Sequence, residues 1–230
     1  MPSRAPISQA APQAAAPIGV WLALALPLVC VALGALALYG GEDGVTAHYA
    51  LWRAAHPEAA RWLRLYTDWG NPALYLVFAG MLLRGVKRRR ADLTGRALAY
   101  LAAQLLVALA LERVLKIGIG RPRPDVGGPL VPFSLDGAHN SMPSGHTVEM
   151  TVQTASLALF AKSMALPIAC GLALALMGYS RMALGAHHPT DLLGGLLVGA
   201  LGGLLCRRLA PRMAAHVAPF LNRLADKGAR

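Results

Sequence analysis

Charged residues are scarce in this chain of 230 residues. Asp, Glu, Lys and Arg together make up 14% of it, whereas a soluble globular domain carries roughly a quarter. This shortage argues against an ordinary soluble domain. The hydrophobic share of 56% and the positive mean hydropathy of +0.47 indicate an integral membrane protein.

Cysteine is also rare, and the few cysteines are poorly placed for chemistry. Cys30, Cys170 and Cys206 each lie inside an apolar run, in no spacing typical of metal ligands. This argues against a disulfide framework or a cysteine metal site. We expect the three side chains to be small, buried apolar residues.

Acidic residues are half as many as basic ones, 11 against 22, which gives a net charge of +11. A strongly basic chain can bind nucleic acid, but here the Lys and Arg residues lie in short loops between apolar runs rather than along one soluble face. We therefore expect no nucleic-acid partner. Such an excess of positive charge is typical of the cytoplasmic loops of a membrane protein.

The apolar runs predict an all-α fold, an integral membrane bundle of six transmembrane helices. Residues 1–17, rich in Pro, Ala, Gln and Ser, are predicted to be a disordered N-terminal tail. The run Ile18–Tyr39 exceeds the roughly 7 to 15 apolar residues of a signal peptide and reaches the roughly 20 that cross a bilayer, so we interpret it as a retained first span. The later spans are predicted at Asn71–Val86, Leu93 to about Ile117, Gly145–Phe160, Leu166–Leu184 and Pro189–Cys206.

The distribution of basic residues predicts the orientation of this bundle. The predicted membrane domain covers residues 18–209, and residues 210–230 form a basic tail. Most of the 22 Lys and Arg residues fall in the two tails and around the loops after the second and fourth spans. Because short loops rich in Lys and Arg stay in the cytoplasm, both termini are expected inside the cell.

An amphipathic segment, His48–Trp69, separates the first two spans. Its aromatic and small residues recur every three or four positions, and Pro57 is predicted to split it into two short helices. The stripe consists of Trp52, Ala55, Ala59, Trp62, Tyr66 and Trp69. Such a stripe beside arginines is typical of a helical segment at the membrane interface. The alternative is a stripe that packs on the bundle.

Three polar clusters lie at the ends of the predicted spans. The link between the third and fourth spans contains KIGIGRPRP and then NSMPSGH, and the link between the fifth and sixth contains SRMALGAHHPTD. Two spans separate the links, so both must emerge on one side of the membrane, which the charge bias makes the extracytoplasmic side. The polar residues pooled there are Lys116, Arg121, Arg123, Ser144, His146, Arg181, His187, His188 and Asp191.

These residue types suit the transfer of a phosphoryl group. Fixed cations stabilise charge on phosphoryl oxygens, and the planar fork of arginine matches a phosphate. On a helix, Asp191 lies i+4 from His187 and i+3 from His188, so the carboxylate could orient either imidazole as a nucleophile. The PSGH segment begins an apolar run, where free backbone N–H groups and the Ser144 hydroxyl form an anion site.

The three clusters also resemble the motifs of a known family. Residues 116–124 fit K-x6-R-P, residues 143–146 are P-S-G-H, and residues 180–191 fit S-R-x5-H-x3-D, in that order along the chain. Together they resemble the type 2 phosphatidic acid phosphatase and vanadium haloperoxidase superfamily. The six-span frame is similar to that of its membrane-bound lipid phosphatases.

The resemblance implies a role for each motif residue. His187, which the family spacing selects over His188, would attack phosphorus to form a phosphohistidine while Asp191 orients it. His146 would protonate the leaving alkoxide and later activate water. The phosphate would bind Lys116, Arg123, Ser144, the backbone amide of Gly145, and Arg181. Neither a metal nor another cofactor is implied.

Two residues beside the first motif are assigned supporting positions. The family spacing selects Arg123 rather than Arg121 as the phosphate ligand, which leaves Arg121 in a supporting position. Glu112 lies four residues before Lys116, so the two are expected to pair on one helix face.

Other polar residues are candidates for neighbouring roles. Glu149 and Gln153 follow His146 on one face of the predicted fourth span and are candidates for lining the substrate cavity; the alternative is a structural hydrogen-bond role. His48 and His139 are interpreted as loop residues rather than ligands.

The main hypothesis is a lipid phosphatase of the cell (inner) membrane that acts on a lipid phosphomonoester or pyrophosphate at its extracytoplasmic face. The resemblance implies substrates such as undecaprenyl pyrophosphate, phosphatidylglycerol phosphate, phosphatidic acid or lipid A phosphates, and the sequence does not select among them. The partners are then membrane lipids, which are expected to enter between spans; the oligomeric state is not readable.

Three other functions compete with this hypothesis. One is a vanadate-dependent haloperoxidase, which shares the motifs but is usually soluble. Another is a non-enzymatic protein that binds or transports phospholipid headgroups. The third is a metal hydrolase with His146, His187, His188 and Asp191 as ligands, which the surrounding cations disfavour.

Overall fold

The computed structural model describes residues 18–227, with side chains as far as Arg223. The predicted disordered tail, residues 1–17, lies outside the described residues. Within the described residues the chain is helical and contains no strand. The elements are α1 (Ile18–Tyr39), α2 (Glu42–Ala55), α3 (Pro57–Lys87), α4 (Ala91–Ala103), the π-helical η1 (Gln104–Leu111), α5 (Glu112–Ile119), the short η2 (Gly137–His139), α6 (Gly145–Ala158), α7 (Ala165–Ala183) and α8 (Pro189–Lys227).

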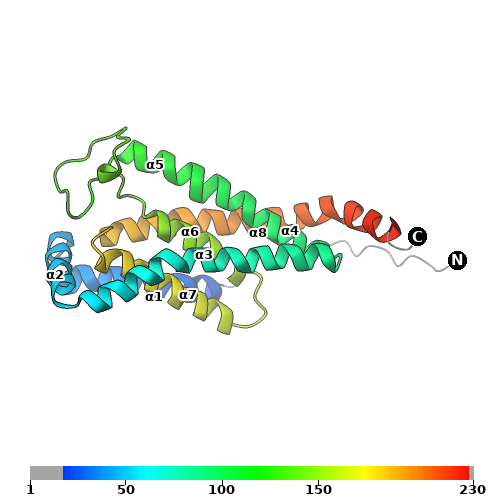
Figure 1. Ribbon diagram of the computed structural model, residues 1–230, viewed down its shortest axis with the longest axis horizontal. Coiled ribbons are helices and arrows are strands. Elements are labelled where there is room, and N and C mark those ends of the chain that lie inside the picture. Colours follow the sequence, from blue (N-terminus) through cyan, green and yellow to red (C-terminus); the bar gives the residue numbers. More distant parts are fainter. Residues whose placement is uncertain (1–17, 228–230) are drawn as a thin grey trace.

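The long helices lie side by side along one axis and alternate in direction (Figure 1). One end of the bundle, which we call the α2 end, carries α2, the link from α5 to α6 and the link from α7 to α8. The opposite end carries the α3–α4 link, the α6–α7 link and the end of α8. The two links that contain the polar motifs therefore share one end, as the topology predicts.

Four helical stretches are long and apolar enough to cross a membrane. They are Ile18–Tyr39, Ala91–Ile119, Ala165–Ala183 and Pro189–Arg223. The other two long elements differ: α6 has only 14 residues, and α3 mixes charged residues with its apolar ones. The six-span topology therefore stays a prediction for α3 and α6.

A single helix, α3, replaces two predicted elements. The sequence predicts a short helix that ends at Trp69 and a span that begins at Asn71, whereas α3 runs unbroken through Pro72. A proline inside a helix removes one backbone hydrogen bond and causes a local clash, and a long packed helix can absorb both. Pro57 does interrupt the chain as predicted, because α2 ends just before it.

The aromatic stripe of residues 52–69 divides between core and surface. Trp52 and Tyr66 pack against a buried cluster that includes Tyr49. Trp62 and Trp69 are 68% and 66% exposed. Part of the stripe thus packs on the bundle, and an interfacial position remains a prediction for the exposed part.

The central element is α6, which carries the PSGH motif at its first turn. It contacts α1, α3, α4, α7 and α8, and most of its residues are buried. Two of its buried threonines donate hydrogen bonds to backbone carbonyls of the same helix. Thr151 donates to the carbonyl of Thr147 over 2.6 Å, and Thr154 donates to that of Met150 over 2.7 Å. These bonds let a polar helix occupy the core.

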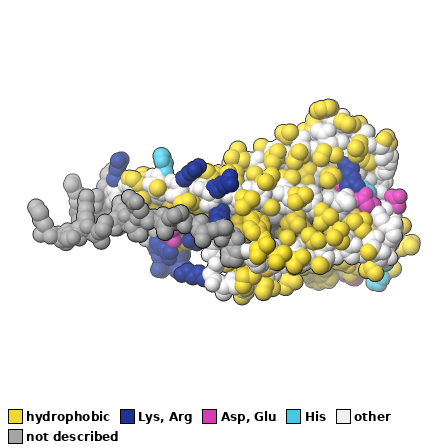
Figure 2. Space-filling model, turned by 180° about the vertical axis from the view of Figure 1, so that it is seen from behind, with side chains coloured by type: hydrophobic (Ala, Val, Ile, Leu, Met, Phe, Trp, Pro, Cys, Tyr) yellow, Lys and Arg dark blue, Asp and Glu magenta, His cyan; other side chains and the backbone are white. Residues whose placement is uncertain are grey.

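The surface differs between the two ends of the bundle. Apolar side chains cover the broad part of the face in Figure 2, and most of the Lys and Arg visible there gather toward the end opposite α2. Exposed leucines also occur along α1 and η1: Leu22, Leu26, Leu33, Leu105, Leu106 and Leu109. Apolar area on this scale suits contact with lipid rather than with water.

Two sequence predictions about helix bounds and cysteines need correction. The helix α8 does not end near Cys206, because it continues to Lys227; an apolar run can end while its helix goes on. Cys170 and Cys206 are buried as predicted, whereas Cys30 is exposed. The exposure follows from α1, which buries residues only along one side, at spacings of three or four.

Candidate active site

The two motif-bearing links meet at the α2 end. The backbone N–H of Ser144 donates to the carbonyl of Asp191 over 3.0 Å, and the Arg123 guanidinium donates to the carbonyl of Ala186 over 3.3 Å. The KIGIGRPRP segment reaches them because Gly120 ends α5 with a φ of 60°. A side chain at that position would collide with the loop backbone, so glycine is required for this turn.

His187 and Asp191 form a buried pair. Nδ1 of His187 lies 3.6 Å from Oδ2 of Asp191 and 3.5 Å from Oγ of Ser141, which itself donates to Asp191 Oδ2 over 2.5 Å. A separation of 3.6 Å is longer than a hydrogen bond, but such contacts often shorten when substrate binds. With Nδ1 turned to the carboxylate, Nε2 is left for a reacting group.

Burial determines the protonation state of His187. Loss of hydration lowers the pKa of its imidazole from 6.5 to about 4; the Asp191 carboxylate opposes this shift, and the charges of Lys116 and Arg181 add to it. A histidine with this pKa is neutral near pH 7. It therefore keeps the lone pair that a nucleophile needs.

His188 contributes its backbone rather than its ring. Its N–H donates to Asp191 Oδ2 over 2.8 Å, and its ring nitrogen Nδ1 lies 3.9 Å from a carboxylate oxygen of Glu42. These contacts favour His187 as the imidazole that Asp191 orients.

Arg121 holds the buried carboxylate in place. Asp191 is fully buried, and Arg121 Nη1 donates to its Oδ1 over 2.6 Å. The same guanidinium contacts Thr190 and Glu42, and the Thr190 hydroxyl donates to Glu42. Because an isolated buried charge is costly, the ion pair with Arg121 helps to stabilise the Asp191 carboxylate beside His187.

Sequence reasoning missed Ser141 and Glu42. Glu42 and Asp43 directly follow the first predicted span. An acidic pair at the same predicted end as the basic motifs was therefore a signal that could have identified Glu42. No spacing marks Ser141, which lies just before the PSGH motif and becomes recognisable only through its contact with Asp191.

The first turn of α6 can receive an anion. The first backbone bond within α6 runs from Val148 N–H to the Ser144 carbonyl, so the N–H groups of Gly145 and His146 have no partner inside the helix. The hydroxyl of Ser144 is buried and accepts a hydrogen bond from Thr147 over 3.0 Å. Unpaired N–H groups at a helix start attract phosphate oxygens.

Small residues allow the neighbouring elements to approach this turn. A Cβ at Gly145 would lie 2.6 Å from Glu112 Oε1 and 3.4 Å from Lys116 Nζ. Glu112 and Lys116 themselves pair over 3.0 Å, as predicted. On the other side, a Cβ at Gly195 of α8 would lie 2.8 Å from the Cβ of Thr147. The two glycines thus bring Lys116 and Asp191 against the start of α6.

Three cations surround the second histidine of the site. Lys116, Arg123 and Arg181 all act electrostatically on His146, and so does His187. The five side chains therefore share one small region. Their combined positive charge favours a bound anion.

The two arginines are held by a few protein contacts and keep free donors. Arg123 Nε donates to the carbonyl of Gly137 over 3.0 Å. Arg181 Nη1 donates to Oγ1 of Thr67 over 3.2 Å, and its buried Nε has no hydrogen-bond partner. A guanidinium has five N–H donors, so both arginines keep donors for an anion.

Glu149 and Gln153 lie deeper along α6 and contact α3. Glu149 accepts hydrogen bonds from Asn71, over 2.8 Å, and from Tyr75. Gln153 is fully buried, and its amide donates to the carbonyl of Asn71 and to the hydroxyl of Tyr100. Both thus have structural hydrogen bonds, and only Glu149 is partly exposed.

Two further histidines, His48 and His139, have other contacts. His48 is in α2 rather than in a loop, and stacks on Tyr39 with ring centroids 4.0 Å apart. His139 lies in η2, with Nδ1 3.4 Å from Asp136. Among residues 18–227, no group of three His, Cys, Asp or Glu side chains is arranged to hold a metal ion.

A family model described as the PAP2 superfamily matches residues 97–213. The matched stretch begins in α4 and ends in α8, and it contains all three motifs and covers half of the chain. The chain belongs to the PAP2 superfamily.

The curated proteins similar in sequence to this PAP2 chain include two lipid A 1-phosphatases. It is 37% identical over 113 residues to a lipid A 1-phosphatase of Rhizobium johnstonii, covering 46% of this chain and 45% of the relative. It is 36% identical over 113 residues to a lipid A 1-phosphatase of Rhizobium etli, covering 46% and 47%. The match thus spans about half the length of each relative. No solved structure gave a significant match.

Proposed function

We propose that this PAP2-superfamily chain is an integral membrane lipid phosphatase, with His187 as its nucleophile. The observation that carries the proposal is the arrangement around His187: a buried, neutral imidazole beside an ionised carboxylate, with Lys116 and Arg181 acting on it. A site of this composition suits an anionic phosphoryl group and an attacking nitrogen.

The reaction proceeds in two steps, transfer of the phosphoryl group to His187 and its transfer to water. Nε2 of His187 attacks phosphorus, the N–P bond forms, and the bond to the lipid oxygen breaks as the ring of His146 gives that oxygen a proton. Burial and the nearby cations lower the pKa of His146 to about 4; the negative charge of a bound phosphate opposes this shift, so His146 takes up its proton in the substrate complex. Neutral His146 then takes a proton from water, whose oxygen attacks phosphorus, and the N–P bond breaks to release inorganic phosphate. General acid and base catalysis of this kind contributes about 10² to 10⁴ in rate.

The charged residues of the site stabilise the transferring group. The phosphoryl oxygens accept hydrogen bonds from Lys116, Arg123, Arg181, the Ser144 hydroxyl and the Gly145 amide. Their fixed positions stabilise charge that spreads over the oxygens in the transition state. Asp191 keeps His187 oriented and stabilises the positive charge that develops on its ring.

Similarity to lipid A 1-phosphatases favours a phosphorylated glycolipid as the substrate. The four long apolar helices, and the Lys and Arg residues that gather toward the end opposite α2 (Figure 2), support a position in the cell (inner) membrane with both termini in the cytoplasm and the α2 end outside. On this proposal Glu149 lines the path of the lipid, since it is partly exposed and lies one turn beyond His146. Gln153, which is buried below it, supports the wall of that path.

The test is phosphate release from a panel of lipid phosphates and pyrophosphates in detergent. We expect wild type to release phosphate with and without chelator, and His187→Ala to lose more than about 10³-fold in rate, since it removes the nucleophile. His216→Ala, an exposed histidine on α8, is the matched control. Binding of the lipids without phosphate release would instead support a headgroup-binding or transport protein.

A further inference from the structure

The link from α5 to α6 contains an apolar segment that the proposed reaction does not use. Residues 126–135, VGGPLVPFSL, contain no charged side chain, and Ser134 is the only residue among them with a polar one. We call this segment the apolar loop. Its large apolar side chains are all exposed: Val126, Leu130, Val131, Phe133 and Leu135. Exposed apolar side chains that are contiguous in this way mark a contact with a partner or with a membrane.

The exposure of Phe133 is not compensated by contacts within the chain. Its φ of 61° lies in the left-handed region, which is unfavourable for a residue that has a side chain. Its ring is 81% exposed, as is the side chain of Leu135, so packing against other described residues does not offset this cost. A contact outside the chain that buries both side chains does offset it.

Backbone hydrogen bonds hold the apolar loop beside a phosphate ligand. The N–H of Val131 donates to the carbonyl of Gly120 over 2.8 Å. Just after the loop, the carbonyl of Ala138 accepts from the N–H of Arg123 over 2.9 Å, and the carbonyl of Gly137 accepts from Nε of Arg123. The loop is therefore tied at both ends to the segment that carries Arg123.

The end of α5 determines the depth of the loop in a membrane. α5 ends the apolar stretch Ala91–Ile119, which has 29 residues and a length of about 43 Å at about 1.5 Å per residue. A bilayer with its headgroups is about 40 to 45 Å thick, so Ile119 lies at headgroup depth when this stretch crosses it. The bond between Val131 and Gly120 returns the loop to the same level. Figure 1 shows the link beside the end of α5, away from the other helices.

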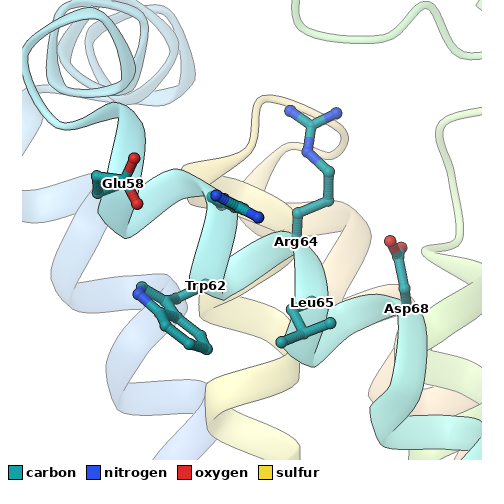
Figure 3. A pocket seen from close by; sticks show the side chains of 6 residues that line it. Glu58, Trp62, Arg64, Leu65 and Asp68 are labelled. Carbon is teal, nitrogen blue, oxygen red and sulfur yellow. The ribbon is translucent and has the colours of Figure 1, made fainter.

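The first turns of α3 lie at the same end of the bundle, on the other side (Figure 1). Figure 3 shows Trp62 and Leu65 on one edge of these turns and Glu58, Arg64 and Asp68 on the other. An exposed tryptophan beside charged residues is typical of the headgroup region. The apolar loop and Trp62 thus give two contact points for a bilayer surface, and in the view of Figure 1 the link from α7 to α8 lies between them.

We propose that the apolar loop inserts into the headgroup region of the membrane and, together with Trp62, holds the candidate active site at the lipid surface. The lipid surface suits the loop better than a protein partner, because the loop lacks the aromatic and arginine side chains with hydrogen-bonding groups that protein interfaces favour. Insertion buries Phe133 and Leu135 and fixes the segment that carries Arg123. At this depth the outer side of the loop still meets water.

The depth of the loop can be measured by fluorescence quenching. In a chain with Cys30, Cys170 and Cys206 replaced by alanine, Phe133→Cys is labelled with bimane and placed in phosphatidylcholine vesicles, with or without lipid that carries a nitroxide at the top of its acyl chain. We expect strong quenching at position 133. Quenching should be weaker with the label at Asp43→Cys, an exposed position in the first turn of α2. Equally weak quenching at both positions overturns the proposal.

The variant Phe133→Ser/Leu135→Ser measures what the loop contributes to turnover. For the lipid that wild type hydrolyses best in the panel above, KM in proteoliposomes should rise about fivefold or more, because apolar contact with the membrane is lost, and kcat should stay at the wild-type value. Asp125→Ser, at an exposed position of the same link, is the matched control and should change neither. A loss of kcat at unchanged KM overturns the proposal, since it indicates a disturbed site.

The quenching measurement needs no turnover, so it decides the proposal even if wild type releases no phosphate from any lipid, an outcome that overturns only the phosphatase function. A contact between two copies of the chain gives a different result. The label at position 133 then stays unquenched in vesicles, and the Phe133→Ser/Leu135→Ser variant forms smaller oligomers than wild type in detergent. Both results overturn a contact with lipid.

Discussion

Asp191 is the residue on which the geometry of the site depends. Its side chain is fully buried, and each of its contacts belongs to a different part of the chain: Arg121 from the first motif, Ser141 from before the second, and the backbone of His188. One carboxylate thus ties the three motifs together. The cost of burying its charge is offset by His187, Ser141 and Arg121 together.

Replacing Arg121 should therefore weaken both stability and catalysis. Arg121→Gln leaves Asp191 buried without its cationic partner, which typically costs about 3 to 5 kcal/mol of unfolding free energy. We expect a lower thermal midpoint in detergent and a lower kcat for phosphate release. Arg113→Gln, an exposed arginine on α5, should leave the midpoint unchanged. Equal midpoints for both variants would contradict this role.

The second residue-scale prediction concerns the protonation of His187. Its pKa of about 4 lies below the unfolded value of about 6.5, so the folded protein takes up this proton only as pH falls through about 4. The unfolded chain takes up the proton at higher pH, near 6.5. The contribution of neutral His187 to the free energy of unfolding is therefore complete above about pH 6.5 and is lost as the pH falls from about 6.5 to about 4. NMR of histidine-labelled protein, assigned with His187→Gln, should show no titration of His187 between pH 5 and 8. A midpoint near 6.5 would contradict the burial argument.

At the scale of elements, the start of α6 is packed too closely for a side chain. Gly145→Ala would place a Cβ 2.6 Å from Glu112 Oε1 and push the Glu112–Lys116 pair away from the phosphate. A misplacement of this kind costs up to about 10²-fold in rate. Gly118→Ala on α5, where a Cβ meets nothing within 4 Å, is the control. Steady-state phosphate release compares the two, and equal rates would contradict the close packing.

Most helices could be predicted from apolar runs, but their ends could not. The predicted spans coincide closely with α1, α6 and α7, where the apolar run and the helix have the same length. They differ for α3 and α8 because both helices continue through prolines and charged residues. Whether a proline breaks a helix depends on what packs around it, which local sequence does not contain.

The motifs predicted which residues converge, but not what supports them. The spacings within KIGIGRPRP, PSGH and SRMALGAHHPTD and the even number of spans between them place Arg123, His146 and His187 at one end. Arg121 could be assigned only a supporting position. Its partner Glu42 comes from α2, and Ser141 from an irregular link. Contacts between distant segments have no periodicity to reveal them.

At the scale of the whole molecule, the two ends of the bundle have different chemistry. The α2 end carries the candidate active site, whereas the opposite end carries Lys87 to Arg90 and the basic end of α8. An apolar surface separates them (Figure 2). A bilayer with its cytoplasmic face at the basic end fits this arrangement, since positive loops are retained inside.

This orientation predicts which loops a reagent outside the cell can reach. In a chain with Cys30, Cys170 and Cys206 replaced by alanine, Leu135→Cys lies in the α5–α6 link at the α2 end, and Ser163→Cys lies in the α6–α7 link at the other end; both positions are exposed. We expect a membrane-impermeant maleimide to label position 135 in intact spheroplasts and position 163 only after permeabilisation. The reverse pattern would put the phosphate site in the cytoplasm and exclude substrates of the outer leaflet, while leaving the contacts between His187, Asp191 and Arg121 as they are.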